Sequence, residues 1–280
     1  MPIQLEGGCR VSRLREGRPE ERGSLRVFRH VDRTTGASAI SLRVLEFAPG
    51  LSPTLANASC DEILFVLAGT GVVLLDGQAY PVGPETGIYL KPGARLVVEV
   101  DDAAPEPLTM VSSRCPDPGP ALAVEPPTAC AAAPSDLDRA APSVTGRPPL
   151  VRLSDCAAET TADRWYRVLL DQKVGSAQVT QFVGGIPPGR APDHYHEYEE
   201  VLCILKGRGR LWAGASNAPI EAGSCVFLPR RQVHCVENTG VGELRLLGVF
   251  YPAGSPAVRY GVDRQGPVTF RSRSGADNER

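Results

Sequence analysis

The sequence lacks long apolar runs, an excess of charge and any secretion signal. No stretch approaches the roughly 20 apolar residues that a membrane-spanning helix needs. The formal net charge is only −2 over 280 residues, so composition favours neither a nucleic acid nor an anionic membrane as a partner. No apolar segment typical of a signal peptide follows Met1. We therefore expect a soluble, cytoplasmic protein that has neither a nucleic acid nor a membrane as its partner.

Regular cysteine spacing is also missing. The chain has eight cysteines but no C-x-x-C pair, and the two halves of the chain do not share cysteine positions. A disulfide framework or a structural zinc knuckle would need such regularity. We expect free, mostly buried thiols. Cys235 follows His234 directly, and strand alternation would turn its side chain to the opposite face.

Helical periodicity over ten or more residues is hard to find, whereas short apolar runs broken by Gly and Pro recur. These runs are 39–47, 63–67, 72–75, 88–90, 96–100, 179–183, 201–205, 225–228, 233–236 and 244–250. Runs of this length and punctuation are typical of the strands of a sandwich or barrel. The sequence predicts an all-β fold of two jelly-roll barrels in tandem.

A proline-rich segment separates the two sets of strands. Residues 116–149 hold nine prolines in an alanine-rich context, which favours an extended linker over a strand. We therefore expect a first barrel over residues 1–115, a linker over 116–149 and a second barrel over 150–280.

The two halves are an internal repeat. A shift of 138 residues aligns residues 62–71 with 200–209, apolar residue on apolar residue and glycine on glycine. The spacing from Glu62 to Leu96 is 34 residues, the same as from Glu200 to His234. A register kept over this span indicates a duplicated domain.

Potential metal ligands survive in only one copy of the repeat. In the second half they are His194, His196, Glu200 and His234. The aligned positions of the first half are Ala56, Ala58, Glu62 and Leu96. We therefore expect one metal ion per chain, held by the second barrel. The first barrel is expected to be metal-free and to stabilise its partner by packing, although a second ligand pocket there is an alternative.

The four residues suit a transition metal. His194 and His196 are two apart, so on a strand both imidazoles point to one face, and Glu200 keeps the same parity. Three of the four histidines of the chain belong to this set, and the fourth is His30. Three imidazoles and a carboxylate suit Fe, Mn, Ni, Co, Cu or Zn, and an octahedral ion would keep two positions open.

The pattern resembles the two motifs of the cupin superfamily. The first motif is matched by Gly189, His194, His196, Glu200 and Gly207, and the second by Gly223, Pro229, His234 and Asn238. Two departures stand out. One residue fewer separates Gly189 from His194 than is common, and Arg231 stands where the second motif usually has glycine. Because the resemblance covers both halves, the whole chain is similar to a bicupin.

The resemblance implies a metal-dependent small-molecule enzyme. We favour an iron-dependent dioxygenase-type oxidoreductase acting on a small polar organic substrate. A hydrolase, isomerase or lyase that uses manganese or zinc is the alternative, nickel is a further possible metal, and a non-enzymatic metal-containing binding protein is a third reading. No helix-turn-helix pattern accompanies the barrels, which argues against a transcription regulator. The chain is expected to be a monomer, as a pseudo-dimer of cupins, or a homodimer.

Four residues near the motifs are candidates for substrate binding: Arg231, Tyr195, Gln181 and Trp212. Arg231 has two interpretations. It is either a surface substitution in a relaxed turn, or its guanidinium overhangs the metal and pairs with a substrate carboxylate.

Overall fold

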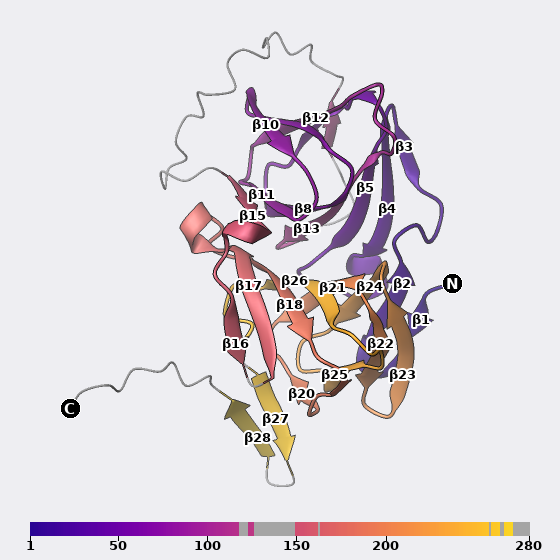
Figure 1. The fold of residues 1–280 in the computed structure, drawn as a ribbon, viewed down its shortest axis with the longest axis vertical. Helices are drawn as coiled ribbons and strands as arrows, with labels where there is room; N and C mark the ends of the chain where they lie inside the picture. The colour runs from indigo at the N-terminus through magenta and orange to yellow at the C-terminus, as the bar shows by residue number, and fades with distance from the viewer. Residues whose placement is uncertain (118–122, 126–148, 162, 258, 264–265, 271–280) are drawn as a thin grey trace, which may run out of the picture.

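The computed structural model describes residues 1–117, 123–125, 149–161, 163–257, 259–263 and 266–270 (Figure 1). These residues form strands and a few single-turn 3-10 helices, with no α-helix among them. The 3-10 helices are η1 (Glu6–Gly8), η2 (Arg33–Thr35), η4 (Leu153–Asp155) and η5 (Gln172–Val174). In the part of the chain so described, no helix is long and apolar enough to cross a membrane.

The first barrel is built from two antiparallel sheets. One has the order β15 (Leu150–Arg152), β11 (Thr86–Leu90), β8 (Asp61–Ala68), β13 (Leu108–Cys115), β5 (Leu42–Phe47), β4 (Leu25–Val31) and β3 (Glu20–Arg22). The other has the order β10 (Gln78–Val82), β9 (Gly71–Leu75), β12 (Arg95–Val100), β7 (Thr54–Ala56) and β14 (Ala123–Glu125), with β6 (Gly50–Leu51) on β12.

The second barrel repeats this plan. Its longer sheet has the order β1 (Ile3–Gln4), β2 (Arg10–Arg13), β24 (Ser224–Leu228), β21 (Glu199–Lys206), β26 (Leu244–Tyr251), β18 (Thr180–Ile186), β17 (Arg164–Leu170) and β16 (Glu159–Thr161). The other has the order β23 (Ser216–Glu221), β22 (Arg208–Ala213), β25 (His234–Asn238), β20 (His194–Tyr195), β27 (Arg259–Asp263) and β28 (Gly266–Phe270), with β19 (Gly189–Arg190) on β25. The prediction of an all-β fold with two jelly-roll barrels is confirmed.

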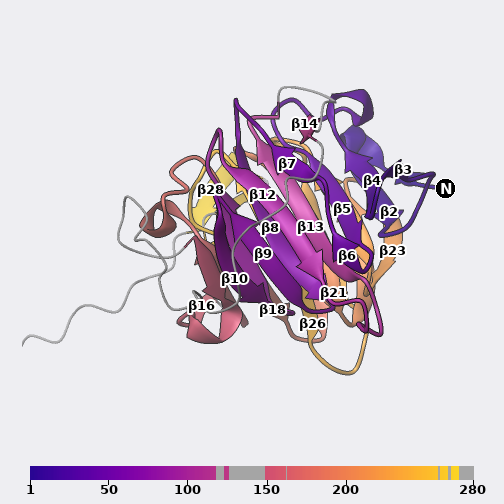
Figure 2. The same ribbon diagram turned by 90° about the horizontal axis from the view of Figure 1, so that it is seen from above.

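Strand alternation divides the longer sheets between two cores. On β21, Leu202 and Ile204 face the interior of the second barrel, whereas Val201 and Cys203 belong to a core shared by both barrels. Phe65 of the first barrel and Phe227 of the second are both fully buried in this shared core. Because both faces of these sheets are buried, the two barrels are joined by a shared apolar core. In Figure 2, the sheet that contains β8 and β13 lies over the sheet that contains β21 and β26.

One strand from each expected domain pairs with a sheet of the other barrel. β2 lies within the expected first domain but pairs with β24 of the second barrel, with Arg10 opposite Phe227. β15 lies within the expected second domain but pairs with β11 of the first barrel. Figure 1 shows β1 and β2 beside β23 and β24 of the second barrel. Each barrel therefore contains a strand from the residue range that was expected to form the other barrel.

The predicted linker, residues 116–149, falls largely outside the described residues. Within it, β14 pairs antiparallel with β7, with Val124 opposite Leu55. This short strand was not expected in a proline-rich segment. It occupies a sequence of three residues without proline, which leaves its backbone N–H groups able to pair.

Candidate metal centre

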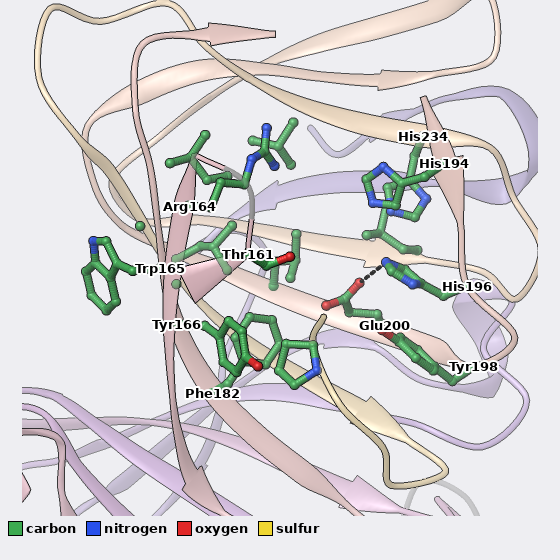
Figure 3. Close-up of a pocket in the computed structure, with 18 residues that line it drawn as sticks. Thr161, Arg164, Trp165, Tyr166, Phe182, His194, His196, Tyr198, Glu200 and His234 are labelled. Atoms are coloured by element: carbon green, nitrogen blue, oxygen red, sulfur yellow. Dashed lines mark ion pairs between the residues drawn. The ribbon is translucent and has the colours of Figure 1, made fainter. Parts of the chain in front are cut away.

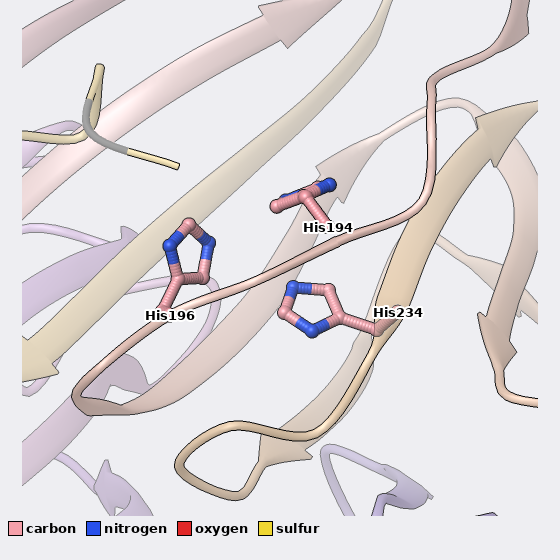
Figure 4. Close-up of side chains that lie close together, drawn as sticks. All are labelled: His194, His196 and His234. Carbon is pink, nitrogen blue, oxygen red and sulfur yellow. The ribbon is translucent and has the colours of Figure 1, made fainter. Parts of the chain in front are cut away.

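Three imidazoles converge inside the second barrel. His194 lies on β20, His196 follows in the turn before β21, and His234 begins β25, where it pairs directly with His194. One potential ligand atom from each ring lies within 4.8 Å of the others. The ring centroids are 4.7 Å apart for His194 and His234 and 5.0 Å apart for His194 and His196 (Figure 4). The fold therefore assembles these three predicted ligands from two strands and a turn.

Backbone carbonyls fix the tautomers of two of these rings. The Nδ1 of His194 lies 3.1 Å from the carbonyl oxygen of Pro192, and the Nδ1 of His234 lies 2.8 Å from that of Gln232. A carbonyl can only accept, so Nδ1 carries the hydrogen and donates in both rings. Each Nε2 is then the unprotonated nitrogen, which is the form that binds a metal.

Glu200 lies beside the three histidines and is buried. One carboxylate oxygen, Oε2, is 3.6 Å from His196 Nε2. Burial raises the pKa of Glu200 to about 8 and lowers the pKa of His234 to about 4, because both charged forms lose hydration. Three imidazoles and a buried carboxyl group fit a divalent transition metal, whose charge would favour the ionised carboxylate.

A cavity of about 100 Å³ adjoins the histidines and Glu200. Apolar parts of its wall come from Phe182, Ile186, Leu202, Leu228, Val236 and Leu246. Polar groups on the wall come from Thr161, Arg164, Tyr166 and Tyr198. Figure 3 shows the histidines on one side and the residues of β17 on the other, with the indole of Trp165 turned away from the histidines. The arrangement is compatible with a metal site next to a small chamber whose wall is partly apolar and partly polar.

Tyr198 forms part of a ring stack at the site. Its ring is stacked on His196, with centroids 4.6 Å apart and planes 9° apart. On its other side it stacks on Phe250, with centroids 4.2 Å apart and planes 17° apart. The stack holds the His196 ring against the barrel wall, so the orientation of this imidazole is fixed by packing.

Two of the four candidate substrate residues lie on other faces of the strands. Trp212 is opposite Cys235 on β25, so it faces away from His234, and its indole N–H donates to Glu237 Oε2 at 2.7 Å. Cys235 is likewise turned from the histidines, as alternation predicted. Gln181 faces the first barrel and donates to the carbonyl oxygen of Leu64 at 3.4 Å. Phe182 is the next residue on the strand, so its side chain points to the opposite face, where it lines the cavity.

The other two candidates flank the ligands. Tyr195 follows His194 on β20, where it pairs in register with Tyr260. Arg231 has φ of 63°, a left-handed backbone that glycine adopts more readily, and its Nε donates to Glu197 Oε2 at 2.8 Å. Its side chain is 71% exposed. Among the described residues that line the cavity, none of the four candidates occurs. Arg231 thus takes the surface position of its first interpretation.

The sequence analysis missed Thr161, Arg164 and Tyr166, which the structure places on the cavity wall. They lie on β16 and β17, outside both motifs and outside the aligned part of the repeat. The signal that could have found them is the alternation of Arg164 and Tyr166 along one strand.

The equivalent position of the first barrel is filled by an ion-pair network. Glu62 pairs in register with Arg114, as Glu200 pairs with Phe250. Arg43 Nη2 donates to Glu62 Oε1, and Arg114 Nε to Oε2, both at 2.9 Å. Burial alone would raise the pKa of Glu62, but the two guanidinium groups outweigh it and hold the pKa below its usual range. Ala56, Ala58 and Leu96 offer no ligand atom, so arginines balance this carboxylate.

Comparison with known proteins agrees with this architecture. Residues 182–250 match the model of the Cupin domain family. The matched residues lie in the second barrel, and the arrangement of two barrels is similar to that of solved bicupin structures. An oxalate decarboxylase variant from Bacillus subtilis superimposes with a TM-score of 0.69 at 14% identity, covering 87% of this chain and 77% of that one. This likeness concerns the fold alone.

Sequence similarity to curated proteins is limited to short segments. An uncharacterised protein of Aquifex aeolicus is 29% identical over 83 residues, which is 29% of this chain and 68% of that protein. An oxalate-binding protein of Thermotoga maritima is 38% identical over 66 residues, which is 23% of this chain and 54% of that protein. The cluster of three histidines in the second barrel is compatible with a metal site.

Proposed function

We propose that this protein is a metal-dependent enzyme whose one transition-metal ion is held by His194, His196, Glu200 and His234. The observation that carries the proposal is the convergence of three histidine nitrogens within 4.8 Å, with the buried Glu200 carboxyl 3.6 Å from His196. In a barrel interior, this donor set would be costly to bury without a cation. Iron is the favoured metal, with manganese, nickel or zinc as alternatives.

The favoured reaction is a dioxygenase-type oxidation of a small polar organic substrate. Held by these four residues, a transition-metal ion would supply the Lewis-acid and redox chemistry that a reaction with dioxygen needs. The apolar wall formed by residues such as Phe182, Leu202 and Leu246 limits water near the metal. Thr161, Arg164 and Tyr166 supply the polar contacts that can orient a substrate on the wall facing the histidines.

A decarboxylase-type lyase is the second candidate. The fold likeness to the oxalate decarboxylase of Bacillus subtilis and the short match to an oxalate-binding protein favour it. Such a reaction would cleave a carbon–carbon bond next to a carboxylate without net consumption of dioxygen. Both candidates need the metal, and they differ in whether oxygen is used up.

Metal analysis followed by gas measurements tests the proposal. The protein should be purified without chelator and without a nickel column, and its metal content measured by plasma mass spectrometry. One ion per chain, with dioxygen consumed on addition of a panel of small organic acids and amides, supports the dioxygenase. Carbon dioxide released from oxalate with no oxygen uptake supports the lyase. Protein that stays metal-free after iron, manganese, nickel and zinc are each supplied contradicts the proposal as a whole.

A further inference from the structure

A groove of about 520 Å³ lies at the seam between the two barrels. Residues of β8 in the first barrel and of β21 in the second line it, and Figure 1 shows these two strands in the two barrels. Most of its wall is apolar. None of its described lining residues belongs to the chamber beside the histidines, so the seam groove is separate from the metal centre. An apolar hollow of this size between two domains is typical of a small-molecule site.

Two equivalent leucines face the seam groove. Leu67 and Leu205 are 138 residues apart and so occupy the same position of the repeat. Each lies at an irregularity of its strand: the register of β8 on β13 skips Leu67, and that of β21 on β26 skips Leu205. A bulge leaves its extra residue outside the ladder and changes the direction of its side chain. Both leucines are only partly buried and both line the groove, as does the partly buried Leu14.

The seam groove carries one excess positive charge. Three of the described residues that line it are charged: Glu85, Lys206 and Arg245. Glu85 and Arg245 compensate each other, because Arg245 Nη2 donates to Glu85 Oε1 at 2.6 Å. Lys206 is exposed, and its ammonium group makes no ion pair in the part of the chain that the structure describes. The four-carbon stem of a lysine lies along apolar surface while its charge stays in water, which suits the rim of such a groove.

We propose that the seam groove binds an aliphatic carboxylate of medium chain length. The carbon chain packs against Leu14, Leu67 and Leu205, and the carboxylate pairs with the Lys206 ammonium group. The ligand thus contacts both barrels at once. This site goes beyond the proposed function, because it shares no described lining residue with the chamber at the metal centre.

Binding of decanoate tests this assignment. Its dissociation constant would be measured by titration calorimetry on the full chain and compared with those of octanoate and decylammonium. Each buried CH₂ group strengthens binding about 4-fold, so decanoate should bind roughly 10-fold more tightly than octanoate. Decanoate should also bind more tightly than decylammonium, because the excess charge of the groove is positive. Equal affinity for octanoate and decanoate would overturn the apolar contact, and tighter binding of decylammonium would overturn the assignment of charge.

Charge reversal at Lys206 locates the carboxylate. Lys206→Glu should weaken decanoate binding about 5-fold at low salt, since an exposed attraction is replaced by a repulsion. The same change should strengthen binding of decylammonium. Lys91→Glu is the matched control, because Lys91 is also an exposed lysine but is not among the lining residues of the groove. This control should keep the wild-type affinities. An unchanged affinity for both probes in Lys206→Glu would refute the role of Lys206.

Two further variants separate the seam groove from other places where decanoate could bind. Leu205→Ser should weaken decanoate binding about 3- to 10-fold, whereas Leu5→Ser should not, because Leu5 is partly buried against the core of the second barrel and outside the groove. His196→Ala should bind decanoate like the wild type. Loss of decanoate binding in His196→Ala would place the ligand at the metal centre and refute the seam site. A thermal melt shows whether Leu205→Ser is folded, and if it is not, the exposed Lys206→Glu still decides.

Discussion

Glu199 accepts two hydrogen bonds from Ser38 across the interface between the barrels. Its Oε1 lies 2.8 Å from the backbone nitrogen and 2.7 Å from the hydroxyl oxygen of Ser38. Its Oε2 accepts from the backbone N–H groups of Ala39 and Ile40. The repeat places Asp61 at the equivalent position, where it accepts from Gln178 of the other barrel at 3.2 Å. The two barrels thus bind each other through related carboxylates at the start of β8 and β21.

Glu199→Ala should destabilise the protein strongly. The change leaves four donors of residues 38–40 without their acceptor. Only the donor of Ile40 is fully buried, and each buried donor left unsatisfied costs about 1–3 kcal/mol. We expect a loss of about 2 kcal/mol in the free energy of unfolding, measured with urea. Glu221→Ala is the control, because its partner Arg13 and Glu221 itself are both more than half exposed. That control should change stability by less than about 1 kcal/mol. Equal effects of the two changes would contradict this account.

Each chain should bind one metal ion, and the histidines should be essential for it. His196→Ala and His234→Ala each remove one nitrogen of the three-histidine cluster, so metal content measured by mass spectrometry should fall from about one ion per chain to near zero. Circular dichroism should still report a folded β-protein, because the barrel cores are apolar. Glu200→Gln should weaken metal retention less, since three imidazoles remain. Normal metal content in both histidine variants would place the site elsewhere.

Arg231→Gly should be more stable than Arg231→Ala. At φ of 63°, any side chain with a Cβ costs roughly 1 kcal/mol or more relative to glycine. Both changes remove the same exposed ion pair with Glu197, so their difference reports the backbone alone. The difference in urea unfolding should be about 1 kcal/mol in favour of glycine. Because Arg231 lies outside the cavity lining, neither variant should change KM, and a raised KM in both would revive its role in substrate binding.

His30 should make stability depend on pH. Its ring joins the barrels: Nε2 donates to the carbonyl oxygen of Leu14 and Nδ1 accepts from the hydroxyl of Ser12, each at 3.0 Å. Burial lowers the pKa of His30 below its usual value near 6.5, so the unfolded chain takes up the proton first as the pH falls. The stability from the neutral ring is fully present above about pH 6.5 and is lost progressively below it.

His30→Gln should therefore flatten the acid side of the stability profile. The free energy of unfolding would be measured between pH 8 and pH 5 for the wild type and the variant, both without metal. Titration of the other three histidines contributes equally to both proteins, so the difference in slope reports His30. Parallel profiles over this range would show that His30 does not titrate in the way that its burial implies.

The features that the sequence predicted correctly are those with a local or repeated signal. Alternation and glycine spacing predicted the strands and the two barrels, and alternation placed His194 and His196 on one face. The addition of His234 came from its place in the second motif of the cupin resemblance. The pairing of β2 with β24 has no such signal, because Arg10 and Phe227 are more than two hundred residues apart. The partners of Glu62 could not be predicted, because Arg43 and Arg114 lie on other strands and no motif marks them. The cavity wall formed by β17 was missed, because which side chains of this strand face the cavity depends on how the two sheets pack to close the barrel.

Glu62 is paired with two buried arginines, whereas Glu200 stands opposite Phe250 at the equivalent position. Glu62→Gln should cost about 3–5 kcal/mol, because it leaves the Arg43 and Arg114 guanidinium groups buried without a full counter-charge. The register of the second barrel suggests the rescue. In the second barrel, Phe250 pairs with Glu200 and so occupies the position that Arg114 has beside Glu62. Phe182 pairs with Gly248 in the way that Arg43 pairs with Ser112, so Phe182 occupies the position of Arg43.

A triple variant, Arg43→Phe, Glu62→Leu and Arg114→Phe, removes all three charges of the network and tests whether the arginines serve only to balance Glu62. Buried ion pairs replaced by apolar groups of similar volume are often neutral or stabilising, so the triple variant should be more stable than Glu62→Gln by about 1 kcal/mol or more in urea. Apolar packing would then replace the arginines, as it does around Phe182 and Phe250 in the second barrel. A triple variant less stable than Glu62→Gln would contradict this account. It would mean that Arg43 and Arg114 stabilise the barrel in some way besides balancing the charge of Glu62.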